Sequence, residues 1–458
     1  MTATKAPPRP SPAPPREYHF PRFERRTLAN GARLLVAPAH KLPLVTTLAL
    51  VDAGAVNDPA GREGLAALTA RALVEGTQAA GGTELTERLE RLGTSLDASA
   101  DWDAAVARLT VHAARLEPAL ALLGEVLMTP AFAERDVERL KAERQAEILQ
   151  LRAEPRGLAD ETFDRVLYAP GSRYAAPEGG TAESVARLTA ADLRRFHAER
   201  YRPGALTLVV VGDVTADDAT RLAERVFGAW SGDAPPPAAA ADRPARLDRA
   251  VHLVAKGDAA QSEIRLGHVG IPRSHPDYFP ATVMNAILGG LFSSRINLNL
   301  RERHGYTYGA FSGFEWRRGA GPWAVSTAVQ SDVTAAAASE TLLEIDRTRE
   351  EAVAEDELTL ATSYLDGVFP IRFETTAAIA VALANMEIYG LPADYYDTYR
   401  AKVRAVTTSD VLEAARRHVQ PERLQLLVVG DPAVVRAPLE ALGFGPMTVY
   451  DAEGRPTG

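Results

Sequence analysis

The sequence of 458 residues contains no cysteine, which excludes disulfide bonds and zinc sites built from thiolates. Long apolar runs are missing too: all are shorter than about ten residues, whereas a helix needs roughly 20 to span a bilayer. Basic residues are outnumbered, with 51 Lys and Arg against 60 Asp and Glu and a net charge of −9. Because nucleic-acid-binding surfaces are usually strongly basic, we expect no nucleic-acid partner.

The start of the chain is rich in proline. Its first 16 residues hold six prolines and no apolar segment of the kind found in signal peptides. We therefore expect residues 1–17 to form a disordered tail. The remaining composition, 46% hydrophobic and 24% charged overall, is typical of globular proteins. We expect a soluble protein with no membrane partner, for which the cytoplasm is the default location.

One stretch of sequence occurs twice. Three landmarks of the first copy recur 218 residues later in the second, namely Asp192 as Asp410, Pro203 as Pro421 and Gly212 as Gly430. In each copy a helix with a Thr cap is followed by a proline and by an apolar strand that ends in Gly-Asp. A constant offset over three landmarks indicates two copies of one domain.

Apolar periodicity places further elements in both copies. Strands are predicted at 33–37, 44–51, 251–255 and 262–271, and helices at 116–127, 134–152, 334–349, 356–365 and 377–388. The pattern predicts a duplicated α+β fold. We place the N-terminal domain at 18–231, a Pro/Ala-rich linker at 232–247, the C-terminal domain at 248–450 and a short tail at 451–458.

Residues 293–309 read SSRINLNLRERHGYTYG. This string resembles the C-terminal motif of the insulinase/pitrilysin type of zinc metallopeptidase, and the resemblance extends over nearly the whole chain beyond the tail. It implies two homologous domains, each a mostly antiparallel sheet covered by helices on one side, which together form a bowl. It also implies that Arg301 and Tyr308 bind substrate by donating hydrogen bonds to a peptide carbonyl, a role that suits a guanidinium and a phenol.

The other half of that family's site is a helix with the sequence G-L-A-H-x-x-E-H-x-x-x-x-G-T, which supplies two histidine ligands and a glutamate that activates water. Residues 64–77 read GLAALTARALVEGT, so the framing residues match and the chemical groups do not. Ala67 and Arg71 replace the histidines, and Ala70 replaces the glutamate. Since Arg cannot deprotonate to become a ligand, we expect no metal in this chain and no catalytic residues in the chain alone.

The family's third ligand is a glutamate in an E-I-x-x-x-x-x-x-P context, which Glu147 fits because Ile148 follows it and Pro155 stands eight residues later. One carboxylate alone does not hold zinc. Glu147 is otherwise a solvated acid of the charged helix at 134–152. The resemblance implies that Arg71 and Glu147 converge in the fold, so a salt bridge between them is a natural replacement for the metal.

Other interpretations of these residues are structural. Arg301 could end a helix and bind its last carbonyl groups, while Tyr306 and Tyr308 could pack on one face of a strand. We assign packing to Tyr306 and keep the substrate-binding role for Arg301 and Tyr308. No two of the nine histidines are spaced at i+2, i+3 or i+4, so no local metal motif replaces the lost one.

A chain with the Arg/Tyr pair but without H-x-x-E-H resembles one subunit of the family's two-chain enzymes. We therefore expect a non-metal-binding subunit of a heterodimeric zinc metallopeptidase, which binds unfolded peptides and is inactive alone. Its expected partner is a homologous subunit that carries H-x-x-E-H and the zinc. Two alternatives stay open: an inactive core, assembly or peptide-binding protein of the same fold, and a homodimeric enzyme with an unorthodox site.

Overall fold

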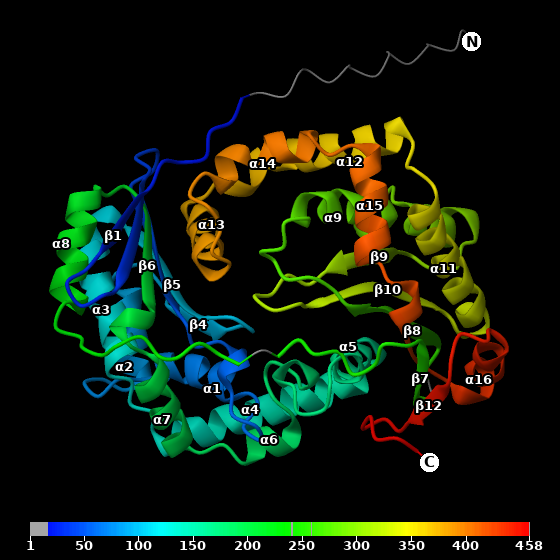
Figure 1. The fold of residues 1–458 in the computed structure, drawn as a ribbon. Helices are drawn as coiled ribbons and strands as arrows, with labels where there is room; N and C mark the ends of the chain where they lie inside the picture. The colour runs from blue at the N-terminus through cyan, green and yellow to red at the C-terminus, as the bar shows by residue number, and fades with distance from the viewer. Residues whose placement is uncertain (1–16, 240, 258, 458) are drawn as a thin grey trace, which may run out of the picture.

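Two six-stranded sheets, one from each half of the sequence, organise the fold (Figure 1). The computed structural model describes residues 17–239, 241–257 and 259–457. The first sheet has the strand order β1-β2-β6-β3-β5-β4 and the second β12-β7-β11-β8-β10-β9. The strands of the first sheet are β1 (Glu24–Thr27), β2 (Arg33–Pro38), β3 (Leu44–Val51), β4 (Asp97–Ala100), β5 (Ala105–His112) and β6 (Leu206–Gly212). Those of the second are β7 (Ala250–Ala255), β8 (Gln261–Val269), β9 (Ala310–Phe314), β10 (Pro322–Gln330), β11 (Gln425–Gly430) and β12 (Met447–Tyr450).

Most neighbouring strands are antiparallel. The parallel pairs are β2 with β6, β7 with β11 and β7 with β12. In Figure 1 the helices and sheets form a curved wall around the middle of the molecule. The predicted α+β fold with two mostly antiparallel sheets is confirmed.

Helices connect and cover the sheets. The first half contains α1 (Leu65–Ala72), α2 (Gly82–Glu90), α3 (Leu116–Met128), α4 (Glu134–Ala153), α5 (Pro155–Leu167), α6 (Ala182–Ala186), α7 (Ala190–Arg200) and α8 (Ala216–Phe227). The second contains α9 (Tyr278–Asn285), α10 (Arg295–Asn297), α11 (Thr334–Glu350), α12 (Glu355–Val368), α13 (Thr376–Ile388), α14 (Tyr395–Arg404), α15 (Thr408–His418) and α16 (Pro432–Ala441). Every strand and helix predicted from apolar periodicity is present, with ends that differ by at most three residues.

The duplication is visible at the level of single hydrogen bonds. Thr189 caps α7, where its hydroxyl accepts from the N–H of Asp192 at 3.2 Å and the Asp192 carboxylate accepts from the N–H of Thr189. Thr407 and Asp410 repeat this capping box at α15 with the same 3.2 Å bond. The order of helices and strands along the chain also repeats, so that α5 in the first half corresponds to α13 in the second.

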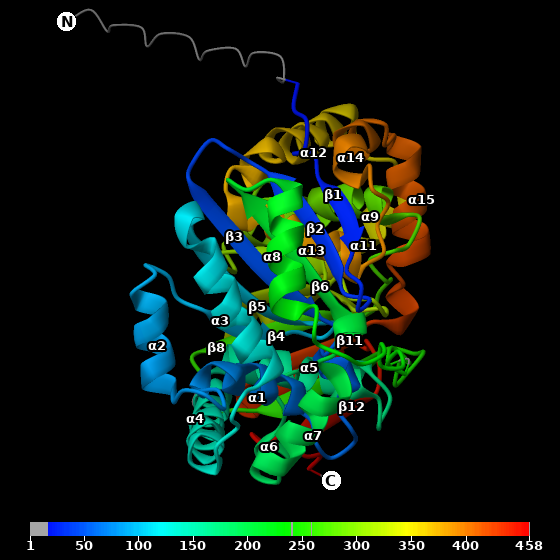
Figure 2. The same ribbon diagram turned by 90° about the vertical axis from the view of Figure 1, so that its left-hand side faces the viewer.

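These two corresponding helices are exchanged between the halves. Helix α13 packs on β3 and β6 of the first sheet, and α5 packs on β8 and β11 of the second. Figure 2 looks at the first sheet from outside, with α8 of the same half in front of it. Each sheet therefore has helices of its own half on one face, as expected, and a helix of the other half on the opposite face.

The exchange joins the two hydrophobic cores. Leu48 and Val209, from strands of the first sheet, belong to the same buried cluster as Leu383 on α13. Leu427 and Val429, from the second sheet, belong to the cluster built around the first half. The two copies of the repeat are thus parts of one cooperative structure rather than independent units.

The connection between the halves is held in place over part of its length. In the described residues of 232–247 there is no helix or strand, but Tyr168 and Pro244 form an isolated β-bridge and the N–H of Ala245 donates to Leu167 at 2.8 Å. The domain boundaries themselves stay a prediction. The predicted disordered tail at 1–17 lies, apart from Glu17, outside the described residues.

No single helix in the described residues is both long and apolar enough to cross a membrane. One pair, Glu355–Phe373 with Thr376–Ile388, reaches that length and hydropathy only in combination and across a bend of 113°.

Candidate functional site

Helix α1 carries the altered zinc motif, and a buried aspartate fixes its start. The carboxylate of Asp58 accepts the N–H groups of Gly64 at 2.8 Å and Ala66 at 2.7 Å, which lack partners within the helix. Arg173 neutralises the carboxylate through a 2.8 Å bond from Nη2. Gly64 has a left-handed φ of 92° and lies so close to the backbone of Gly179 that a Cβ would approach its oxygen to 2.6 Å. Only glycine fits there.

Beside α1 lies a pocket of about 370 Å³ that the altered motif lines. Ala67 and Arg71 from α1 contribute to it, together with Glu147 from α4. The structure therefore brings together the three positions that correspond to metal ligands in the resemblance. Ala70 is different, because it is fully buried and is not one of the lining residues.

The guanidinium of Arg71 occupies this pocket in an ion-pair network. Its Nη1 donates to Glu147 Oε1 at 2.9 Å and its Nη2 donates to Glu143 Oε2 at 3.2 Å. Arg144 adds a second cation, with its Nη1 3.3 Å from the other oxygen of Glu147. The salt bridge predicted between Arg71 and Glu147 is confirmed.

These residues do not fit a zinc ion. The donor set contains carboxylates but no imidazole, and the guanidinium groups of Arg71 and Arg144 already bind Glu147. Zinc sites use three or four ligands drawn from Cys, His and carboxylates, and a guanidinium is not among them. In this pocket the guanidinium groups of Arg71 and Arg144 balance the charge of Glu147.

Glu178 also lines this pocket, although no motif in the sequence distinguishes it. Burial raises the pKa of this carboxyl to about 7, and the nearby charges of Asp101 and Glu315 act in the same direction. Glu178 thus exchanges a proton near neutral pH, next to the ion pairs of Arg71. A perturbed acid in a cleft is a marker of functional sites, and only the folded structure reveals it.

Arg301 lies in a π-helical turn, Leu298–Arg303, a feature that is frequent at functional sites. Its guanidinium stacks on the ring of Phe292, with Cζ 4.4 Å from the ring centre. Its Nη1 is 3.0 Å from Glu302 Oε1, yet in the described part of the chain it has no partner with hydrogen-bond geometry. The side chain is oriented by stacking and is 33% exposed, while Nη1 itself is shielded from solvent beside Glu302.

Tyr308 projects from the loop before β9 and is 93% exposed. The loop is fixed by Thr307, whose hydroxyl donates to the carbonyl of Gly309 at 2.9 Å and accepts from Thr327 at 3.0 Å. Tyr306 is half-buried and stacks on His304, with ring centres 4.9 Å apart. The packing role predicted for Tyr306 agrees with this position, although both tyrosines precede the strand rather than lie in it.

The two halves of the expected site do not form one pocket in this chain. Neither Arg301 nor Tyr308 is among the described residues that line the pocket beside α1. No hydrogen bond or ring contact joins Arg301 to Tyr308 in the described residues. The pair can meet a common ligand only if that ligand spans them.

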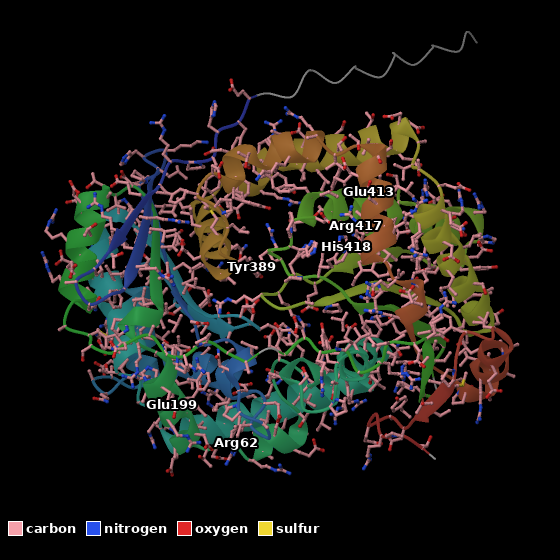
Figure 3. The ribbon with its side chains drawn as sticks, in the orientation of Figure 1. Arg62, Glu199, Tyr389, Glu413, Arg417 and His418 are labelled. Atoms are coloured by element: carbon pink, nitrogen blue, oxygen red, sulfur yellow. The ribbon has the colours of Figure 1, made fainter. Side chains whose placement is uncertain are left out.

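A second group of metal-binding residue types lies elsewhere, where His275, Asp277 and His418 place one ligand atom each within 4.8 Å of one another. His418 and Arg417 are at the end of α15 (Figure 3). Spacing rules missed this group because 141 residues separate Asp277 from His418. Asp277 Oδ2 already binds His418 Nε2 at 2.7 Å and Arg417 Nη1 at 3.1 Å, so a guanidinium satisfies the carboxylate and disfavours a metal cation.

Comparisons with known proteins agree with this geometry. A sequence model of the insulinase family (peptidase family M16) matches residues 36–173, and a model of the peptidase M16 inactive domain matches residues 187–365. Together they cover most of the chain, with residues 174–186 between the two matches.

Curated relatives carry different descriptions. An uncharacterized zinc protease of Streptomyces coelicolor is 23% identical over 90% of this chain and 91% of its own length. A non-peptidase homolog of Helicobacter pylori is 24% identical over 86% of this chain and 90% of its length. A probable mitochondrial-processing peptidase subunit beta of Schizosaccharomyces pombe is 28% identical over 59% of each chain.

The fold also matches solved structures. The crystal structure of a peptidase M16 inactive domain from Pseudomonas fluorescens has a TM-score of 0.84 and 27% identity, over 89% of this chain and 98% of that one.

Proposed function

Because the chain belongs to the insulinase (M16) family, which includes peptidases and non-peptidase homologues, we propose that it is the non-metal-binding subunit of a two-chain zinc metallopeptidase. Its partner is a homologous subunit that carries H-x-x-E-H and the zinc ion. The observation that carries this proposal is the 2.9 Å ion pair between Arg71 and Glu147, in the position where an active member holds its metal.

The ion pair supports an accessory role because it stabilises the pocket without a ligand for zinc. Without a cation between them, the carboxylates of Glu143 and Glu147 would repel each other. Here Arg71 contacts both carboxylates, and Arg144 contacts Glu147 as well. The arginines of this chain therefore neutralise both carboxylates without a metal cation.

Arg301 and Tyr308 support a role in peptide binding. The side chain of Arg301 is one-third exposed, and the side chain of Tyr308 is 93% exposed on a fixed loop. Both groups donate hydrogen bonds, so they suit the carbonyl oxygen of a peptide that lies between the two subunits. One such donor is worth on the order of 3 kcal/mol in a transition state.

The relative described as subunit beta of a processing peptidase supports an assembly of unlike chains. Because the chain belongs to a peptidase family, we propose unfolded peptides as the substrate class.

The test is reconstitution with a homologous chain that contains H-x-x-E-H, assayed on an unfolded quenched-fluorescence peptide. The chain alone is expected to contain no stoichiometric zinc and to be inactive. In the reconstituted pair, Arg301→Ala is expected to lower kcat/KM by roughly 100-fold, and Tyr308→Phe by roughly 10-fold or more.

Matched controls are Arg303→Ala, on the same π-helical turn, and Tyr364→Phe, on an exposed face of α12. Neither is expected to change turnover by more than about twofold. Unchanged turnover in both Arg301→Ala and Tyr308→Phe would contradict the proposed role of the pair.

A second candidate is a peptide-binding or assembly protein without proteolysis, which the description of the Helicobacter pylori relative favours. It predicts a stable complex with a partner that also lacks H-x-x-E-H. Peptide affinity then depends on Arg301 and Tyr308 while no cleavage occurs. A third, the homodimeric enzyme with an unorthodox site, predicts peptidase activity in the purified chain.

A further inference from the structure

A separate pocket of about 530 Å³ lies where the two halves of the chain meet. Its wall combines β5 of the first half with α13, α14 and the loops before α9 and β10 of the second. Tyr389, which follows α13, marks its position near the middle of the molecule (Figure 3). The pocket shares no lining residue with the one beside α1.

A buried arginine lines this pocket. Arg273 is only 8% exposed, and its Nη2 donates to the hydroxyl of Tyr395 at 2.5 Å. Its guanidinium lies over the ring of Tyr278 at 3.5 Å and over that of Tyr395 at 5.0 Å. No carboxylate of the described residues lies within ion-pair distance of Arg273.

The tyrosines do not neutralise this charge. Burial raises the pKa of the Tyr395 hydroxyl, so the group remains a neutral phenol at physiological pH. Cation–π contacts of this kind offset only part of the penalty for an unpaired buried charge. Arg273 is thus a buried cation that lacks its counter-ion.

Two further arginines stand at the edge of the pocket. Arg108 on β5 and Arg372 after α12 are exposed, and neither forms an ion pair with a described residue. Asp97 lies opposite Arg108 in the strand pair but does not reach ion-pair distance. None of the described lining residues is acidic, so the local charge is positive in a protein whose net charge is −9.

The rest of the lining is apolar or aromatic. Phe369, Phe373 and Trp316 line it with aromatic rings, and Val381 on α13, which is 39% exposed, adds an aliphatic side chain. A cation at the bottom, cations at the edge and rings on the walls complement an anion attached to an apolar group.

We propose that this pocket binds a carboxylate carried on an apolar or aromatic group, with the carboxylate paired to Arg273 and the apolar group against the rings. The source is either the C-terminal residue of a peptide or a free aromatic acid. The proposal does not depend on a partner subunit, on zinc or on Arg301 and Tyr308.

Calorimetric titration of the full chain tests it. N-acetyl-phenylalanine and a short peptide that ends in Phe with a free carboxylate are each compared with their C-terminal amides. The acids are expected to bind at least 10-fold more tightly than the amides, since the amide cannot pair with Arg273. Tight binding of the peptide acid alone identifies a peptide terminus, and equal binding of the small acid identifies a free acid.

Variants locate the site without disturbing the buried arginine. Arg372→Ala is expected to weaken acid binding severalfold, and Val381→Glu to abolish it, because the new carboxylate enters the pocket. The matched control Val434→Glu, on α16 where Val434 is 41% exposed, is expected to bind like the native chain. Arg301→Ala is also expected to bind normally.

Equal affinity for acids and amides would overturn the proposal, as would no acid binding at millimolar concentration. Acid binding that survives Val381→Glu would overturn it too. Arg273→Met is informative if it folds, and the two surface variants keep the test decisive if it does not.

Discussion

Arg71 on α1 and Glu147 on α4 are 76 residues apart in the sequence and 2.9 Å apart in space. Their side chains are 38% and 43% exposed, so the pair faces the pocket rather than the core. The pair links α1 to α4 at the pocket, and a guanidinium supplies no Lewis acid there. Several measurements follow from this arrangement.

Ala67→His with Arg71→His is expected to create a zinc site, because both positions line the pocket with Glu147. Two imidazoles and a carboxylate are a sufficient donor set for zinc. Elemental analysis of the purified double variant is expected to give about one zinc per chain. Adding Glu147→Gln is the control and is expected to abolish most of that content; zinc retained in full would contradict the placement of Glu147.

Arg71→Ala is expected to lower the free energy of unfolding only slightly, by about 1 kcal/mol or less, since the ion pairs are partly exposed and screened by solvent. Urea unfolding at low and high salt measures the change. The difference is expected to shrink in high salt. A loss above about 3 kcal/mol would mean that the guanidinium is a buried structural element instead.

Glu178→Gln is expected to stabilise the protein at pH 8 and to have little effect at pH 4. The carboxyl has a pKa of about 7 in the folded state, raised chiefly by burial, and about 4.3 when unfolded. Between those values the folded state binds more protons, so the contribution of Glu178 to stability is full below about pH 4 and falls as the pH rises through 7.

Glutamine does not ionise, so the variant avoids this loss. We expect a gain of about 1 kcal/mol at pH 8, less than the whole pKa shift because the group reaches solvent through the pocket. Thermal unfolding between pH 4 and pH 8 checks the sign. A variant that is less stable than the native chain at pH 8 would contradict the raised pKa.

Leu383→Ala on α13 is expected to lower the free energy of unfolding by about 2–5 kcal/mol, because the side chain is fully buried. The first sheet is expected to lose protection from hydrogen exchange together with the second half, since α13 packs on β3 and β6. Leu360→Ala on α12, where the side chain is 52% exposed, is the matched control. Protection lost only in the second half would argue against coupled cores.

The exchange of helices also predicts the behaviour of fragments. Fragments 17–231 and 248–457 are each expected to aggregate when expressed alone, because each exposes one uncovered sheet face. Co-expressed, they are expected to associate and purify together. A soluble, folded single fragment by circular dichroism would contradict this expectation.

The sequence predicted the duplicated fold well because the evidence was local. The capping boxes at Thr189 and Thr407 and the buried strands that follow them are written in consecutive residues. The Arg71–Glu147 pair was predictable only through resemblance, since nothing in either helix alone indicates the other.

What the sequence could not predict depends on contacts across the fold. Periodicity shows that α13 is apolar but not that its partner is the sheet of the other half. Asp277 binds His418, although 141 residues separate the two in the sequence. The sequence does not show that Arg273 lacks a carboxylate partner, because that depends on which acidic residues the fold brings near it.

The exchanged helices α5 and α13 restrict how this chain can move. A hinge motion between its halves would have to expose an apolar face of both sheets at once, so the two halves move as one rigid body. Under the proposed function, an opening that admits or releases a long peptide then takes place between this chain and its partner subunit, not within the chain.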